Sequence, residues 1–309
     1  VKAFHQIPIH PDDKCKTALC TPFGLFHFNY MPFGLKNASA SFQRFVDQIF
    51  RNLDFVFIYI DDILIFSPDE QTHIAHLKQV FEILNANDLR ISLKKCTFLV
   101  ESIDFLGCNI SESGMKPTQS KINELASFPY PNDSRSLRRF LGMIGFYRKL
   151  IKNYSQLIFP LSECMRINPN SKSITLSEEE KNCFRLMIET LTNLEPLAHP
   201  HATSKQMQLI TDCSQYCMGA VLHEMVNGEA IPIGFFSKKL NQAQTSYSAF
   251  DRELLAAYYS VLHFKHQLEG RDVLLITDHK PLLSAFKSPN YCKSFQCESR
   301  DKSQSKYDG

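Results

Sequence analysis

The sequence predicts an α+β chain with more than one domain, and three observations lead to this prediction. Residues 1–112 alternate β-rich runs with two helical stretches, residues 113–175 are mainly helical, and residues 176–289 return to strands around further helices. At 309 residues the chain is long enough for two or three separate cores. We therefore expect an antiparallel sheet backed by helices, then a helical domain, then an α/β domain.

The elements of the first part follow from local patterns. Residues 1–35 mix short apolar stretches with Pro and Gly, which is typical of strands and turns. Residues 37–50 and 70–88 carry apolar side chains at helical spacing. Two runs rich in β-branched and aromatic residues flank Asp61 and Asp62, and they predict a tight hairpin with both acids at its tip. A further strand pair is expected at 97–100 and 103–109.

The later elements are predicted in the same way. Apolar periodicity predicts a helix over 134–154 and another over 177–194, where Ser177 and Glu180 have the spacing of a capping box. The segment 160–176 between them is predicted to be a linker. The remaining expected elements are strands within 206–240, a helix over 247–268, a strand over 272–278, a short helix from Pro281, and a disordered or foreign polar tail over 290–309.

Composition limits the possible functions. Hydrophobic residues make up 44% of the chain and charged residues 21%, which is typical of a soluble globular protein. The apolar run around Asp61 is far shorter than the ~18 residues of a membrane span, and no signal peptide opens the sequence. We therefore expect a cytoplasmic protein with no membrane partner. Because the net charge is only +2, any nucleic-acid binding must come from local basic patches.

The acids within FIYIDDILIF (57–66) interrupt an apolar run. A buried, unpaired carboxylate is costly, so Asp61 and Asp62 must be hydrated, hydrogen-bonded or bound to a cation. A hairpin tip projects both acids to one side, where Mg²⁺ could bind their oxygens. By themselves, two Asp residues in a turn fit a solvent-exposed strand end better than a metal site.

Four motifs in order resemble the reverse transcriptases of gypsy-like LTR retrotransposons, and the resemblance covers about residues 1–289. The motifs are FHQIPI (4–9), MPFGLKNASASFQR (31–44, with Ser39 where the family usually has Pro), YIDD (59–62) and LKKCTFLVESIDFLG (93–107). The resemblance implies that Asp61 and, less centrally, Asp62 bind two Mg²⁺ or Mn²⁺ ions. It also implies that Phe4 lies beneath the incoming sugar, although an ordinary core aromatic is the alternative. The residues expected to border the nucleotide and template are Phe33, Gly34, Lys36, Tyr59 and Ile60.

A basic segment follows. Residues 134–154 contain six basic residues and no acid, and Gly142, Gly145 and Phe146 lie opposite the apolar stripe. Exposed glycine destabilises a helix, so close approach of a nucleic acid explains this face, with packing on a neighbouring domain as the alternative. The position is similar to the thumb of the family. The residues expected to contact nucleic acid are Arg135, Arg138, Gly142, Phe146 and Lys149.

A second acidic set consists of Asp212, Glu253 and Asp278, each in an apolar setting on a separate element. Singly, each acid could be a strand end or a helix surface. Together they resemble the ribonuclease H domain of the same family, which implies two Mg²⁺ or Mn²⁺ ions at this site as well. The sequence departs from the family at Cys213 and Cys217, where Ala and Gly are usual.

We therefore predict an RNA-directed DNA polymerase with ribonuclease H, acting on a primer–template, a hybrid duplex and deoxynucleoside triphosphates. Other parts of a polyprotein are expected partners, within or outside virus-like particles. The family's first catalytic Asp is expected two positions before Val1, and its fourth ribonuclease H acid beyond Pro289, so impaired activity is expected. The alternative is an inactive nucleic-acid-binding remnant. The expected domains are palm with part of the fingers (1–112), thumb and linker (113–175), connection with a truncated ribonuclease H-like domain (176–289), and the tail (290–309).

Overall fold

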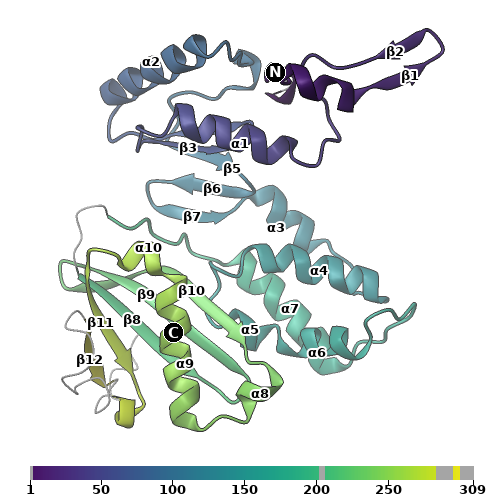
Figure 1. The fold of residues 1–309 in the computed structure, drawn as a ribbon. Coiled ribbons are helices and arrows are strands. Elements are labelled where there is room, and N and C mark those ends of the chain that lie inside the picture. Colours follow the sequence, from purple (N-terminus) through teal and green to yellow (C-terminus); the bar gives the residue numbers. More distant parts are fainter. Residues whose placement is uncertain (1–2, 202–205, 283–294, 300–309) are drawn as a thin grey trace. The chain divides into compact units, whose positions relative to one another are not determined.

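The computed structural model describes residues 3–201, 206–282 and 295–299 (Figure 1). The chain divides into two compact units, unit 1 (Val1–Glu101) and unit 2 (Ser102–Gly309). Both units combine helices with antiparallel strands, which confirms the predicted α+β class. Within the described ranges, no helix is both long and apolar enough to cross a membrane.

Unit 1 is organised around two α-helices. Its elements are the 3₁₀ helices η1 (Ala3–Gln6), η2 (Pro11–Thr17) and η3 (Leu93–Lys95), the strands β1 (Leu19–Thr21), β2 (Gly24–Phe26), β3 (Val56–Tyr59) and β4 (Asp62–Ile65), and the helices α1 (Ala38–Ile49) and α2 (Glu70–Ala86). Phe42 and Val46 of α1 and Val80 and Leu84 of α2 are buried in one core, against which β3 and β4 pack. The apolar faces predicted for both helices thus hold the β3–β4 hairpin in place.

The strands of unit 1 differ from the prediction. They form two separate antiparallel pairs, β1–β2 and β3–β4, in place of one sheet. Residues 97–100 were predicted to be a strand, and that prediction is wrong. Leu99 has a φ of 54°, a left-handed conformation that interrupts extended backbone. The single strand predicted at 103–109 is instead two paired strands, Ser102–Phe105 and Cys108–Ser111, and both belong to unit 2.

The first half of unit 2 joins a small sheet to a helical core. Its elements are β5 (Ser102–Phe105), β6 (Cys108–Ser111), β7 (Gly114–Pro117), α3 (Gln119–Ala126), α4 (Ser134–Phe146), α5 (Tyr154–Leu157), α6 (Phe159–Ile167) and α7 (Glu178–Thr192). Leu137, Phe140 and Ile144 of α4 are fully buried in this core. Ser177 caps α7 in the predicted capping box with Glu180.

Two predictions for this half are wrong. The helix expected over 134–154 ends at Phe146, and Asn153 has a left-handed φ of 53° before α5 begins. Leu150 and Ile151 are buried nevertheless, so the apolar pattern reported burial correctly although the backbone is no longer helical. The segment predicted to be a linker contains α6, whose Leu161 is fully buried.

The second half of unit 2 is a five-stranded sheet with the strand order β10-β9-β8-β11-β12. Its elements are β8 (Gln206–Cys213), β9 (Cys217–Val226), β10 (Glu229–Lys239), α8 (Gln242–Thr245), α9 (Ala249–His263), α10 (Lys265–Leu268), β11 (Asp272–Thr277) and β12 (Phe295–Ser299). The three antiparallel strands β8 to β10 follow one another directly, whereas β11 pairs with β8 in parallel. Helix α9 packs on β8 and β9.

Strand β12 corrects the predicted tail. Residues 295–299 fall within the segment expected to be disordered or foreign, yet they pair in parallel with β11 (Figure 1). An edge strand is held by backbone hydrogen bonds, so it needs no apolar periodicity in its sequence. The short helix predicted from Pro281 is described only to residue 282, and the rest of the tail lies outside the described residues.

Candidate active sites

The predicted acidic hairpin is present in unit 1. Tyr59 pairs with Asp62 at the end of β3 and β4, and Ile60 and Asp61 form the two-residue turn between them. Ile60 has a φ of 54°, which a β-branched residue rarely adopts. Asp61 and Asp62 are both exposed, so water relieves the cost of placing two charges beside an apolar run.

Phe4 and the Pro32–Lys36 turn come together beside the core of unit 1. The Phe4 ring lies 5.8 Å from Phe33 and 5.8 Å from Phe42, edge to face in both pairs. Gly34 has a φ of 92° with open space around it, and the Lys36 side chain is exposed. His5, which the sequence reasoning missed, contacts the Phe33 ring at 4.9 Å. Because His5 directly follows Phe4 in the sequence, its nearness to the Phe33 turn could have been predicted.

The second acidic set converges in unit 2. One carboxylate oxygen from each of Asp212, Glu253 and Asp278 lies within 4.8 Å of the others. Strands β8 and β11 pair in parallel with Ile210 opposite Ile276, so Asp212 and Asp278 leave the same end of neighbouring strands. Helix α9 brings Glu253 to them.

Glu253 is the unusual member of this triad. It is only 7% exposed, whereas the other two acids are exposed. Burial, with the neighbouring charges of Asp212 and Asp278, raises the pKa of Glu253 from 4.5 to about 7. The Cys213 N–H donates to Glu253 Oε1 at 3.2 Å, while Glu253 Oε2 is buried without a hydrogen-bond partner.

These donors fit a divalent cation. Three carboxylates are the ligands that Mg²⁺ and Mn²⁺ prefer, and a cation would satisfy the unpaired Oε2 of Glu253. At the hairpin the donor set is smaller, since no third acidic or histidine side chain of the described residues forms such a cluster with Asp61 and Asp62. Arg252, which the sequence reasoning also missed, donates to the Ser214 carbonyl oxygen at 2.9 Å.

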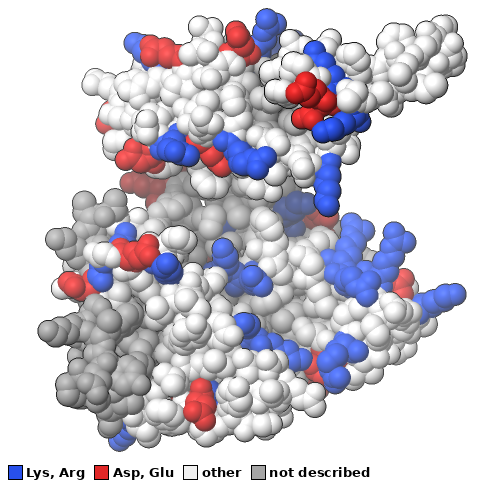
Figure 2. All heavy atoms as spheres, in the orientation of Figure 1, with Lys and Arg blue, Asp and Glu red and all other residues white. Residues whose placement is uncertain are grey.

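Helix α4 presents the predicted basic face. Arg135, Gly142 and Phe146 are exposed, and a Cβ added to Gly142 would meet nothing within 4 Å. Figure 2 shows Lys and Arg side chains gathered over the α4 region of unit 2. Arg138 is exposed but partnered, because it donates to the Pro169 carbonyl oxygen at 2.8 Å. Lys149 lies beyond the end of α4, so it does not share the helical face expected for it.

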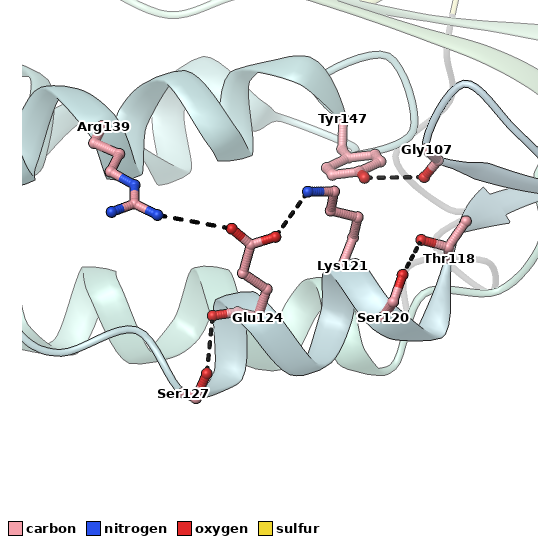
Figure 3. A network of polar contacts seen from close by, with 8 residues as sticks. All are labelled: Gly107, Thr118, Ser120, Lys121, Glu124, Ser127, Arg139 and Tyr147. Atoms are coloured by element: carbon pink, nitrogen blue, oxygen red, sulfur yellow. Dashed lines mark hydrogen bonds and ion pairs between the residues drawn. The ribbon is translucent and has the colours of Figure 1, made fainter.

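A polar network fixes the β5–β6 turn against α4 (Figure 3). The Tyr147 hydroxyl donates to the Gly107 carbonyl oxygen at 3.0 Å, and burial raises the pKa of Tyr147 to about 12. Glu124 of α3 binds Lys121 at 2.7 Å and Arg139 at 3.9 Å. Arg139 is thus tied to α3, which leaves Arg135 as the less constrained cation of the helix.

Two family models match separate parts of the chain. Residues 1–110 match the family described as reverse transcriptase (RNA-dependent DNA polymerase), and residues 202–298 match the RNase H-like domain found in reverse transcriptase. The second match extends through most of β12, which agrees with the correction to the tail. The two matches therefore identify a reverse transcriptase domain and an RNase H-like domain in this chain.

Retrotransposon polyproteins are among the relatives. The chain is 37% identical over 283 residues to the retrovirus-related Pol polyprotein from transposon 297 of Drosophila melanogaster, covering 91% of this chain and 26% of that protein. It is 33% identical over 287 residues to the transposon Tf2-3 polyprotein of Schizosaccharomyces pombe (strain 972 / ATCC 24843), covering 91% of this chain and 21% of that protein. The chain belongs to the reverse transcriptase and RNase H-like region of retrotransposon Pol polyproteins, and it spans about a quarter of their length.

Solved structures share the fold. The foamy viral protease–reverse transcriptase dRH in complex with double-stranded DNA has a TM-score of 0.84 at 18% identity, covering 97% of this chain and 56% of that one. The foamy viral protease–reverse transcriptase in complex with an RNA/DNA hybrid has a TM-score of 0.81 at 19% identity, covering 96% of this chain and 43% of that one.

Proposed function

We propose that this chain copies RNA into DNA and degrades the RNA strand of the resulting hybrid. The polyprotein relatives support this proposal, as do the foamy viral complexes with double-stranded DNA and with a hybrid. The observation that carries it is the convergence of Asp212, Glu253 and Asp278, because clustered carboxylates suit metal-assisted cleavage of a phosphodiester.

At the triad, Asp212, Glu253 and Asp278 would hold Mg²⁺ or Mn²⁺. A cation bound there supplies an activated water and stabilises charge on the phosphate that is cleaved. Asp212 and Asp278 are exposed, so a phosphate of the RNA strand can reach their side of the site. The Cys213 N–H orients Glu253 by holding Oε1, and Oε2, which has no hydrogen-bond partner, would be available to hold the cation.

At the hairpin, Asp61 and, less centrally, Asp62 would hold the cations for nucleotide addition. Phe4 would lie beneath the sugar of the deoxynucleoside triphosphate and exclude a 2′-hydroxyl, because its contacts with Phe33 and Phe42 fix the ring. The residues proposed to border the nucleotide and template are Phe33, Gly34, Lys36, Tyr59 and Ile60.

Nucleotide addition by this chain is proposed to be impaired. The described residues offer two carboxylates at the hairpin, whereas two bridged cations need more oxygen ligands. Loss of ~4 kcal/mol of transition-state stabilisation would slow the reaction about a thousandfold.

Helix α4 is proposed to follow the primer–template. Arg135 and Arg138 would meet phosphates, while Gly142 allows the backbone of the nucleic acid to come close. Phe146 would contact a sugar or base, because its ring is exposed on the same helix as Gly142. Lys149 would add a phosphate contact beyond the end of the helix.

The division into palm with part of the fingers (1–112), thumb (113–175) and connection with ribonuclease H-like domain (from 176) is part of the proposal. So are a cytoplasmic location, within or outside virus-like particles, and association with other parts of the polyprotein. The two relatives are polyproteins, which supports the proposed association with other parts of a polyprotein.

A primed RNA template with Mg²⁺ and deoxynucleoside triphosphates tests the function, with DNA extension and RNA loss measured in one reaction. We expect RNA loss to disappear in Asp278→Asn and to persist in Asp61→Asn. Any DNA extension should persist in Asp278→Asn and disappear in Asp61→Asn. Glu229→Gln, an exposed change on β10, is the control. A chain that binds the template without extension or RNA loss, under Mg²⁺ or Mn²⁺, would favour the alternative of an inactive nucleic-acid-binding remnant.

A further inference from the structure

We propose that Gln43 is a positioning residue for the Tyr59–Asp62 hairpin, and that Asp47 fixes the direction of the Gln43 amide. Three hydrogen bonds carry the inference. Gln43 Oε1 accepts from the Ile60 N–H at 2.7 Å, and Gln43 Nε2 donates to the Ile58 carbonyl oxygen at 3.1 Å and to Asp47 Oδ1 at 2.8 Å. The inference rests on the proposed role of Asp61 and Asp62 as cation ligands.

The Gln43 amide takes the place of a third strand at the hairpin. Because Tyr59 and Asp62 close the turn as a pair, the backbone groups of Ile58 point away from β4, toward the open edge of β3. An open edge has unpaired donors and acceptors. A side-chain amide has the same N–H and C=O as a peptide group, so Gln43 pairs with this edge in the way that a neighbouring strand would.

This contact acts on the residue that sets the turn. Ile60 is β-branched and has a φ of 54°, a conformation that is strained unless the surroundings hold it. The 2.7 Å bond from its N–H to α1 provides that restraint. Asp61 follows Ile60 directly, so relaxation of the Ile60 backbone would move the carboxylates relative to each other.

Asp47 removes an ambiguity that every amide side chain has. A flipped Gln43 would turn its oxygen toward the Ile58 carbonyl oxygen and the Asp47 carboxylate, and three acceptors would then face one another. Asp47 lies one turn along α1 from Gln43, so one helix carries both side chains. The acid therefore selects the orientation in which Oε1 meets the Ile60 N–H.

Cleavage of the chain by bound Fe²⁺ tests this site by site. Fe²⁺ can replace Mg²⁺, and with added hydrogen peroxide as oxidant and ascorbate to regenerate Fe²⁺ it cuts the backbone nearby. Cuts at 59–62 therefore report the hairpin, and cuts near Asp212 report the triad in the same sample. We expect Gln43→Glu to raise the Fe²⁺ concentration for half-maximal hairpin cleavage about tenfold, as changes to residues that orient metal ligands do. The Fe²⁺ concentration for half-maximal cleavage near Asp212 should not change. The matched control is Gln48→Glu, an exposed position on α1 that receives the same negative charge.

The outcomes separate the two proposals. Wild-type hairpin cleavage that Gln43→Glu leaves unchanged would overturn the positioning role alone. No hairpin cleavage in the wild type, with cleavage at the triad intact, would overturn the proposed cation site at Asp61 and with it this inference. If Gln43→Glu fails to fold by circular dichroism, Asp47→Ala decides, since its exposed site tolerates truncation. A higher Fe²⁺ concentration for half-maximal hairpin cleavage in Asp47→Ala supports the inference, and a concentration equal to that of the wild type overturns it.

Discussion

Replacing Glu253 by Gln should stabilise the protein at alkaline pH in the absence of metal. Burial and two neighbouring carboxylates raise the pKa of Glu253 from 4.5 to about 7 in the folded state. The unfolded chain therefore releases this proton at a lower pH than the folded chain does. The free energy of unfolding falls as the pH rises from about 4.5 to about 7. At about 1.4 kcal/mol for each pH unit, the loss is about 3 kcal/mol at pH 8. Glu253 is 7% exposed, so solvent screens little of this energy.

Gln removes the titration while it keeps an oxygen for the Cys213 N–H. Urea unfolding of the wild type and of Glu253→Gln, at pH 4.5 and pH 8 in chelator, should give similar stabilities at the lower pH. At pH 8 the variant should be more stable by about 3 kcal/mol. Adding Mg²⁺ at pH 8 should restore the stability of the wild type, because a cation pairs with the buried charge. It should have little effect on the stability of the variant.

Glu229→Gln makes the same charge change at an exposed position and controls for net charge. A stability difference between wild type and Glu253→Gln that does not vary with pH would show that Glu253 does not titrate as described. A variant that is less stable than the wild type at pH 8 without metal would show the same.

Three further predictions concern backbone and charge. Gly142→Leu should fold normally, since nothing lies within 4 Å of an added Cβ, and should weaken hybrid binding in fluorescence anisotropy without changing its salt dependence. An unchanged affinity would show that the nucleic acid does not approach Gly142 closely. Arg135→Gln should lower the slope of log affinity against log salt by about one unit, and an unchanged slope would show that Arg135 does not contact a phosphate. Gly114→Ala should cost more than about 2 kcal/mol in urea unfolding, because its Cβ would lie 2.3 Å from the Leu197 carbonyl oxygen. Gly228→Ala has a positive φ but no such neighbour, so an equal loss in both would show that the Leu197 contact is unimportant.

Local patterns predicted the features that depend on neighbouring residues. The runs around Asp61 were sufficient to predict a tight turn, and the spacing of Ser177 and Glu180 was sufficient to predict a helix start. Each depends on a few adjacent residues and their backbone hydrogen bonds. The apolar stripe of 134–154 predicted burial correctly, but periodicity alone did not locate the end of α4 at Phe146.

The rest required the tertiary structure. Strand β12 is held by pairing with β11, and its polar sequence carries no strand pattern. Gln43 stood within a quoted motif, yet only the fold shows that its amide meets the backbone of Ile58 and Ile60. The resemblance was sufficient to predict that Asp212 and Asp278 lie close together. The burial of Glu253, which raises the pKa of its carboxyl, depends on how helix α9 packs and could not be predicted from the sequence.

Asp212, Glu253 and Asp278 are proposed to hold a divalent cation. Anomalous scattering from crystals soaked in Mn²⁺ at pH 8 tests this proposal, because the signal locates the ion itself. We expect a Mn²⁺ peak bound by the three carboxylates, including Glu253 Oε2, and no peak there in crystals of Asp278→Asn. Wild-type crystals with saturating Mn²⁺ and no peak among these carboxylates would contradict this proposal.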